Sequence, residues 1–174
     1  MPQRIQVGSL LSASYELTRP ADTTAYAAGD AIANSTTAWA VVPLQFTVSG
    51  EFGATGLIIG ARLFTSSATA FAATRLWLFN RQPFAAAGYQ ADNSALALTY
   101  AAMTSTGGCM GYVDFATFTA RTTSAVSIAT SPQTELDFTC GPTNNVIYGL
   151  FEAMSAFTPA SAQTFTATLS VRAS

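Results

Sequence analysis

Hydrophobic and polar side chains alternate along the last segment of the chain. Within residues 163–172, one face carries Phe165, Ala167, Leu169 and Val171, and the opposite face carries Thr, Ser and Arg. Alternation with a period of two residues is typical of an antiparallel strand with one buried face. The segment is therefore predicted to be a strand of this kind.

The same alternation recurs upstream, between stretches rich in turn-forming residues. The predicted strands are residues 15–18, 40–48, 55–64, 71–79, 112–118, 122–130, 134–140 and 146–151. Short strands at even spacing favour an all-β fold, a jelly-roll-like antiparallel β-sandwich, over βαβ units. Pro43 cannot donate to a strand ladder, so the 40–48 strand is expected at a sheet edge. A short helix is predicted at 95–103, and a long ordered loop at 20–37.

Two of the predicted strands carry apolar side chains on both faces. In 55–64 and 71–79 the second faces include large apolar residues and one arginine, which predicts either central strands or strands covered by a neighbouring subunit. A sugar-stacking platform is a further possibility for the exposed aromatic side chains. The candidate subunit interface consists of Ile58, Phe64, Arg75, Trp77 and Phe79.

The length of 174 residues fits one domain with a full hydrophobic core. We expect a sandwich domain at 12–174 and an N-terminal arm at 1–11. Alternating apolar residues would let the arm pair with the sheet edge of a neighbour. The candidate contact residues of the arm are Arg4, Ile5, Val7, Leu10 and Leu11.

Charged residues make up only 9% of the chain, compared with about 25% in an ordinary globular protein. Because charges are depleted in interface cores, the composition favours a homo-oligomer. The seven arginines are scattered, which argues against a nucleic-acid partner. No apolar stretch approaches the roughly 18 residues of a membrane span. The first 20 residues lack the apolar core of a secretion signal, so folding in a cytoplasm is expected.

The residues that usually perform catalysis are scarce. The chain has no His and no Lys, which excludes the common triads and lysine nucleophiles. Cys109 and Cys140 are expected to be free thiols, with no metal site and no cofactor. Glu135 and Asp137 could act as an acid–base pair or bind Ca²⁺, but a solvated polar face is the simpler interpretation. We therefore do not expect an enzyme.

Several short motifs, in order along the chain, are similar to those of a known group of proteins. They are TRPADTTAYAAGD at 18–30, NS at 34–35, GARL at 60–63, LWLF at 76–79, ADNSA at 91–95, YGL at 148–150 and AFTP at 156–159. The chain resembles small structural proteins of tailed bacteriophages, namely head-decoration or capsid-cement proteins, from Tyr15 to Val171.

This resemblance implies a jelly-roll-like trimer on the outer head surface of a virion, made in the host cytoplasm. Its partners would be two further copies of itself and the major capsid protein. The function expected from the resemblance is that of a cement that stabilises the shell. The alternative is a carbohydrate- or receptor-binding β-sandwich domain of a phage fibre or tail.

Overall fold

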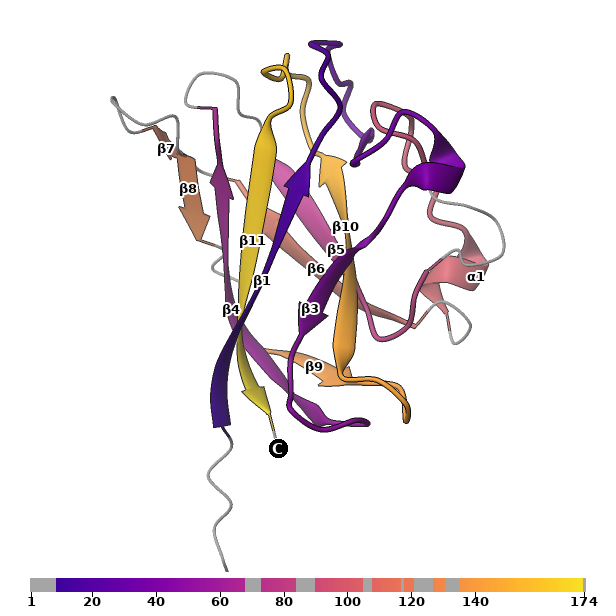
Figure 1. The fold of residues 1–174 in the computed structure, drawn as a ribbon, viewed down its shortest axis with the longest axis vertical. Coiled ribbons are helices and arrows are strands. Elements are labelled where there is room, and N and C mark those ends of the chain that lie inside the picture. Colours follow the sequence, from indigo (N-terminus) through magenta and orange to yellow (C-terminus); the bar gives the residue numbers. More distant parts are fainter. Residues whose placement is uncertain are drawn as a thin grey trace, which may run out of the picture.

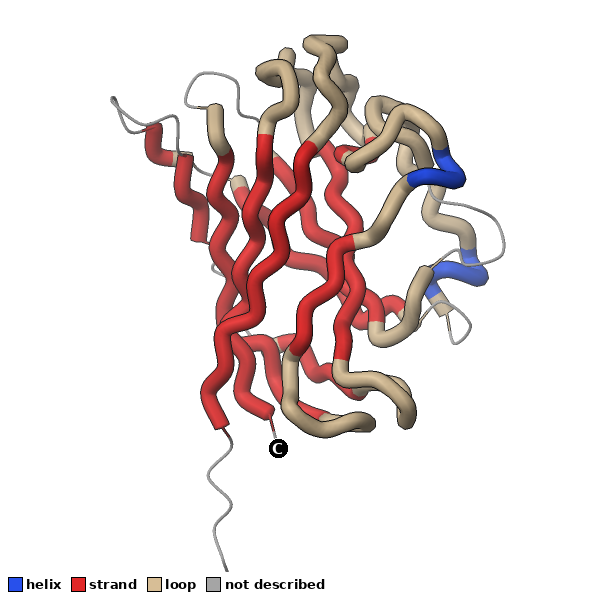
Figure 2. The backbone as a smooth tube through the Cα atoms, in the orientation of Figure 1, coloured by secondary structure: helices blue, strands red, loops and turns tan. Residues whose placement is uncertain are grey.

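The computed structural model describes residues 9–67, 73–83, 90–104, 108–116, 118–120, 127–130 and 135–173. These residues form two antiparallel sheets that face each other, with loops gathered beside one of them (Figures 1 and 2). The first sheet contains β1 (Ser9–Thr18), β11 (Thr164–Ala173), β4 (Thr55–Thr65), β9 (Leu136–Thr139), β8 (Ser127–Thr130) and β7 (Thr119–Ala120). The second contains β2 (Ala31–Ile32), β3 (Leu44–Thr47), β10 (Val146–Ala153), β5 (Thr74–Phe79) and β6 (Cys109–Phe115).

The strand order is that of a jelly roll. In the first sheet, β1 pairs with β11, β11 with β4, and β4 with both β8 and β9. In the second, β3 pairs with β10, β10 with β5, and β5 with β6. Apart from the short β2 and β7, the first strand therefore pairs with the last, and the second with the second-last. The chain is thus a long hairpin rolled into two sheets, which confirms the predicted fold class.

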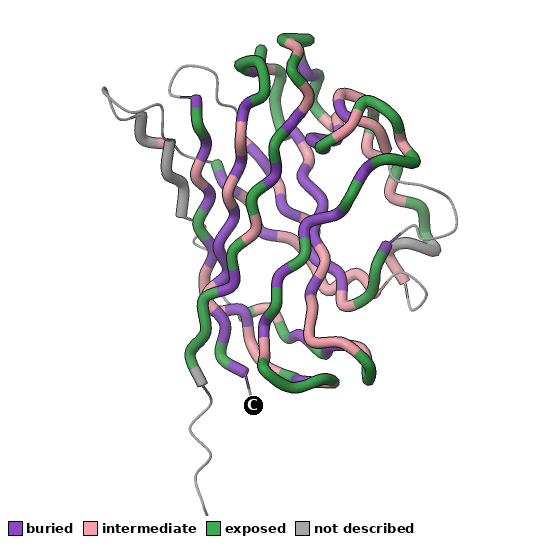
Figure 3. The backbone as a smooth tube through the Cα atoms, in the orientation of Figure 1, coloured by how far each residue is buried: buried purple, intermediate pink, exposed green. Residues whose placement is uncertain are grey.

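The alternation predicted for the last strand fixes which of its faces is buried. In β11, Phe165, Ala167, Leu169 and Val171 are fully buried between the sheets. Figure 3 shows buried and more accessible residues alternating along β1 and β11. The inward residues of both sheets form one continuous core, in which Phe46, Phe115 and Phe151 are among the largest buried side chains.

A bulge in β4 changes the face that its residues present. Ser170 is opposite Gly60 and Val171 is opposite Ile58, so Ile59 is an extra residue in the ladder. Simple alternation along 55–64 placed Ile58 on the second face, and this is wrong. The extra residue shifts the period by one, and Ile58 is buried in the main core, 2% exposed.

Loops of the same chain cover part of the outer face of the second sheet. Ala33 and Val41 from one segment, and Leu96 from another, pack with Phe79 and Leu150 in a second apolar cluster. The prediction that Phe79 lay on a face that one sandwich could not cover is therefore wrong. Phe79 is fully buried by the protomer itself.

The remaining sequence predictions differ from the structure mainly at their boundaries. β1 begins at Ser9, so Leu10 and Leu11 belong to a strand and not to the arm, whereas Arg4, Ile5 and Val7 lie outside the described residues. β3 is an edge strand beginning after Pro43, as expected.

The helix predicted at 95–103 is a single turn, α1 (Tyr100–Met103), and a 3-10 turn, η1 (Ala38–Ala40), was not predicted. Residues 71–72, 117, 122–126 and 134 of the predicted strands also lie outside the described part.

Candidate interaction surfaces

The outer face of β1 and β11 carries mostly hydroxyl side chains. Because the apolar half of each strand points inward, the polar half points outward, and the register places Ser12 opposite Ser170 and Ser14 opposite Thr168. We call this surface the hydroxyl face. It consists of Ser12, Ser14, Thr18, Thr164, Thr166, Thr168 and Ser170.

Neighbouring side chains already satisfy part of the hydrogen bonding of this face. The hydroxyls of Ser14 and Thr168 lie 2.8 Å apart, and Thr166 Oγ1 donates to Glu16 Oε2 at 3.2 Å. On these two strands Glu16 and Arg172 are the charged residues that accompany the hydroxyls. A surface of this kind can be covered by another protein without stripping water from many charges.

A cluster of aromatic and charged side chains occupies the outer face of the second sheet. Arg75 of β5 donates from Nε and Nη2 to the two carboxylate oxygens of Asp114 on β6, at 2.6 and 2.9 Å. The guanidinium also lies 3.8 Å from the ring centroid of Tyr112 and 5.3 Å from that of Trp77. Trp77 Nε1 donates to Glu152 Oε2 at 2.7 Å.

The polar groups of this cluster therefore bind one another. The paired Asp114 side chain holds the pKa of Arg75 above its ordinary value. Arg75 covers one face of the Tyr112 ring, and the Trp77 indole N–H is directed to a carboxylate of the same chain. A sugar platform needs an open aromatic face and unpaired polar groups beside it. The arrangement is better suited to joining β10, β5 and β6 than to holding a glycan.

A buried ionic network joins three loops at the end of the sandwich where β1 finishes. The Arg19 side chain is fully buried and donates to Asp22 Oδ1 at 3.0 Å, to Asp92 Oδ2 at 3.1 Å and to Tyr26 Oη at 2.9 Å. Its Nη1 also donates to the carbonyls of Asp22 and Ala160. Tyr26 donates to Asp92 Oδ1, which accepts the backbone N–H of residue 33 as well. We call Arg19, Tyr26, Asp22 and Asp92 the loop clasp.

Burial and hydrogen bonds shift the pKa values of the loop clasp. Removal from water raises the pKa of Asp92, although the hydrogen bonds from Tyr26, Ala33 and Arg19 act in the opposite direction. The pKa of Tyr26 is raised for the same reason and by its hydrogen bond to Asp92. The backbone N–H of residue 24 and the Arg19 guanidinium lower the pKa of Asp22. Tyr26 also stacks on Phe157, with ring centroids 4.8 Å apart, so the network is fixed by packing.

The cysteine and carboxylate candidates from the sequence lie at the start of β6 and in or beside β9. Cys109 and Cys140 are free thiols, as expected, and burial raises the pKa of each. Glu135 precedes β9 with a φ of 84° and does not continue the strand alternation of Asp137. Among the described residues, no group of three or more Cys, Asp or Glu side chains could hold a metal ion. No helix in the described part is long and apolar enough to cross a membrane.

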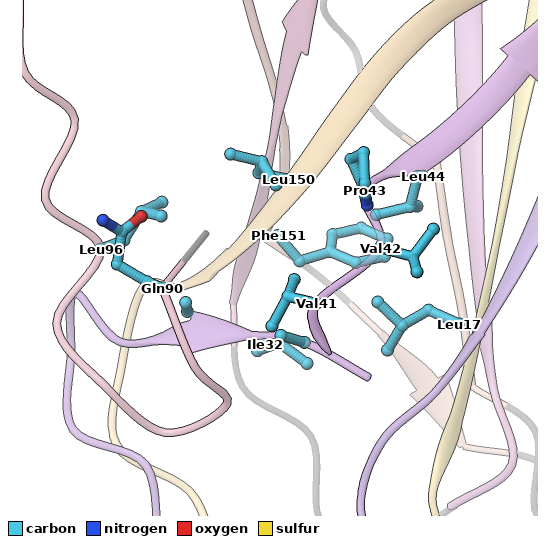
Figure 4. A pocket seen from close by; sticks show the side chains of 12 residues that line it. Leu17, Ile32, Val41, Val42, Pro43, Leu44, Gln90, Leu96, Leu150 and Phe151 are labelled. Carbon is cyan, nitrogen blue, oxygen red and sulfur yellow. The ribbon is translucent and has the colours of Figure 1, made fainter. Parts of the chain in front are cut away.

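A small apolar cavity lies beneath the loop that leads into β3 (Figure 4). Its volume is about 10 Å³, close to the space that one water molecule needs. Leu17, Ile32, Val41 and Phe151 line it, and Gln90 approaches from a separate loop. The cavity is too small for a substrate or cofactor, whose pockets measure roughly 300 Å³ or more.

The structure separates the five residues predicted as a subunit interface. Ile58 and Phe79 are buried inside the protomer, so their side chains are not available to a partner. Phe64, Arg75 and Trp77 are partly accessible, but Phe64 is on the first sheet and the other two are on the second. The sequence interpretation also missed the hydroxyl face. Its signal in the sequence is the Thr and Ser half of the alternation at 163–172.

Comparisons with known proteins found little sequence similarity. No protein-family model matches the chain, and no curated protein matches it. Among solved structures, the chain is similar to one in the "Cyanophage Pam1 capsid asymmetric unit", with a TM-score of 0.36 and 13% sequence identity. That alignment covers 99% of this chain and 90% of the other.

Proposed function

We propose that the protein is a virion structural protein, a homotrimeric decoration or cement protein that binds the outer head surface and acts by contact, without catalysis. The observation that carries the proposal is the hydroxyl face. It carries few charges and is built on the strand pair that closes the jelly roll. Such a face can lie against a shell protein at a low cost of desolvation.

Two further features support this proposal. Jelly rolls recur among viral capsid domains, and the motifs of the chain resemble those of phage decoration proteins. A trimer that contacts several capsid subunits at once would also gain from multivalency, so each contact can be weak. The alternative of a glycan-binding domain finds less support, because the Arg75 cluster uses its polar groups internally.

The test is binding to purified heads that lack the protein, at low salt and near 1 M salt. Because the proposed contact has few charges, binding should change little between the two, although the Debye length falls to about 3 Å at 1 M. Bound protein should raise the temperature at which the heads release DNA. If no protein binds at either salt, or if DNA release is unchanged, the cement function is wrong.

A charge placed on the hydroxyl face tests the surface itself. The Ser12→Arg variant should lose most head binding, because a desolvated arginine without a partner is costly to bury. Ser155→Arg, at an exposed bend outside the hydroxyl face, is the matched control and should bind as the parent does. Equal binding by both variants would rule out the hydroxyl face as the contact.

A further inference from the structure

An open groove of about 240 Å³ runs beside the second half of β1. Tyr15, Glu16, Leu17 and Thr18 form one wall, and Asn34 and Val42 form the other. The Val42 side chain is 44% exposed, although it is a large apolar residue. The groove therefore combines the backbone of a strand, an exposed valine and one carboxylate.

The backbone of β1 along this groove lacks a strand partner. Among the described residues, β1 pairs with β11 on one side only, along its full length of 10 residues. Natural proteins protect such edges with proline, bulges, inward charges or a covering segment. β1 has no proline and no bulge against β11, and Glu16 is its single charged residue. β3 packs near part of β1 without pairing with it, so the unpaired backbone of β1 is suited to accept an added strand.

The alternating arm residues cannot pair with this part of β1 in the same chain. The tightest reversal is a two-residue hairpin turn, here at residues 7–8. Residue 6 would then lie opposite Ser9, and Arg4 opposite Leu11. In that register Arg4, Ile5 and Val7 do not reach the groove from Tyr15 to Thr18. Only an arm from another copy can place Arg4, Ile5 and Val7 there.

The composition of the arm complements the groove. Arg4 is the only charged residue before Glu16 in the chain, and Glu16 is the only charged residue of the groove. Ile5 and Val7 are two apart, so in an extended strand both side chains point to one face, where Val42 and Leu17 are the aliphatic residues of the groove.

We propose that the N-terminal arm of one copy adds as a strand along the free edge of β1 in the next copy, in the groove formed by residues 15–18 with Asn34 and Val42. Ile5 and Val7 contact Val42 and Leu17, and Arg4 pairs with Glu16. The contact uses different surfaces on the two copies, so it can close into a ring, as a trimer requires. The inference rests on the oligomer of the proposed function and identifies how that oligomer is joined.

The first test reverses the two charges in the full chain. Arg4→Glu and Glu16→Arg should each weaken the oligomer, because each replaces an attraction between the two side chains by a repulsion. Its dissociation constant should rise by at least about fivefold at low salt. The double variant should recover most of the loss. Glu51→Arg, which changes an exposed carboxylate in another loop, is the control and should have no effect. Sedimentation or light scattering over a dilution series measures the change.

The second test locates the arm directly. Val7→Cys and Val42→Cys proteins, made separately and then mixed under oxidising conditions, should form a cross-linked dimer. Val7→Cys mixed with Ser155→Cys should not. Absence of the Val7–Val42 cross-link, together with unchanged dissociation in Arg4→Glu, would overturn the inference.

The outcomes also separate this inference from the proposed function. Cross-linking of the Val7→Cys arm to the capsid protein on heads, and not to Val42 of a second copy, would overturn arm exchange and leave the cement function intact. A cross-linked oligomer that does not bind heads would support arm exchange and refute the cement function.

Discussion

At the scale of single residues, Arg19 is the charge on which the end of the sandwich depends. Its guanidinium is fully buried and joins the loop after β1 to Asp92 and to the carbonyl of residue 160. Removing one partner of a buried ion pair is costly, because the other charge stays buried without compensation. The loop clasp thus orders loops that have little secondary structure of their own.

The Arg19→Met variant should therefore be much less stable than the parent. Methionine retains much of the buried volume but leaves the Asp92 carboxylate without its cation, so we expect a loss of about 3–5 kcal/mol in the free energy of unfolding. Urea denaturation measures this loss. Arg75→Met is the comparison, because Arg75 and its partner Asp114 are partly exposed. Its loss should be clearly smaller, and equal losses would contradict the special role of Arg19.

At the scale of elements, the two glycines of β4 have different neighbours. A Cβ on Gly56 would lie 2.2 Å from the backbone oxygen of Arg172 and 2.8 Å from the Phe138 ring. A Cβ on Gly60, on the same strand, would meet Ser170 at an ordinary 3.8 Å. Gly56 lets β4 approach β11 and β9 closely, whereas Gly60 is not needed for packing.

Alanine substitutions should show this difference. Gly56→Ala should lower the free energy of unfolding by about 1–3 kcal/mol or more, because a backbone oxygen cannot move aside easily. Gly60→Ala should be neutral or stabilising by up to about 1 kcal/mol, since alanine restricts the unfolded chain. Thermal unfolding of both variants under one condition gives the comparison. A stable Gly56→Ala protein would mean that the β4–β11 spacing is looser than described.

At the scale of the whole molecule, the two sides of the sandwich are covered unequally. The second sheet carries loops of its own chain over Phe79 and Leu150. In the described part of the chain, β1 of the first sheet pairs with β11 alone, so its other edge has no strand partner there. The contacts between copies in an oligomer are therefore expected on the first sheet. They are not expected on the second apolar faces of β4 and β5, where the sequence had placed them.

The assembled particle should be a trimer of about 54 kDa, three times the chain mass of 18.1 kDa. Light scattering at micromolar concentration measures the mass, and truncation of residues 1–8 provides a comparison. If arm exchange joins the copies, the truncated protein should have the mass of one chain. A monomeric full-length protein would contradict the trimer.

The sequence predicted the strands better than it predicted what surrounds them. Alternation located β11 to within a residue, because that strand has one apolar and one polar half. It failed for Ile58, since a bulge at Ile59 depends on pairing with β11 and leaves no local signal. It failed for Phe79 because the covering loops come from distant segments. Arg19 and Asp92 are 73 residues apart, and neither segment has a sequence pattern that predicts their ion pair.

The closing pair of the jelly roll also bears on how the chain folds. β11, the last strand in sequence, lies between β1 and β4 in the middle of the first sheet, so that sheet cannot form until the end of the chain has been synthesised. Contacts between such distant segments make folding slow, in the range of milliseconds to seconds for β-sandwiches. During that interval β1 and β4 expose apolar faces that invite aggregation. Removal of the last ten residues would thus leave two unpaired edges where the native sheet has its centre.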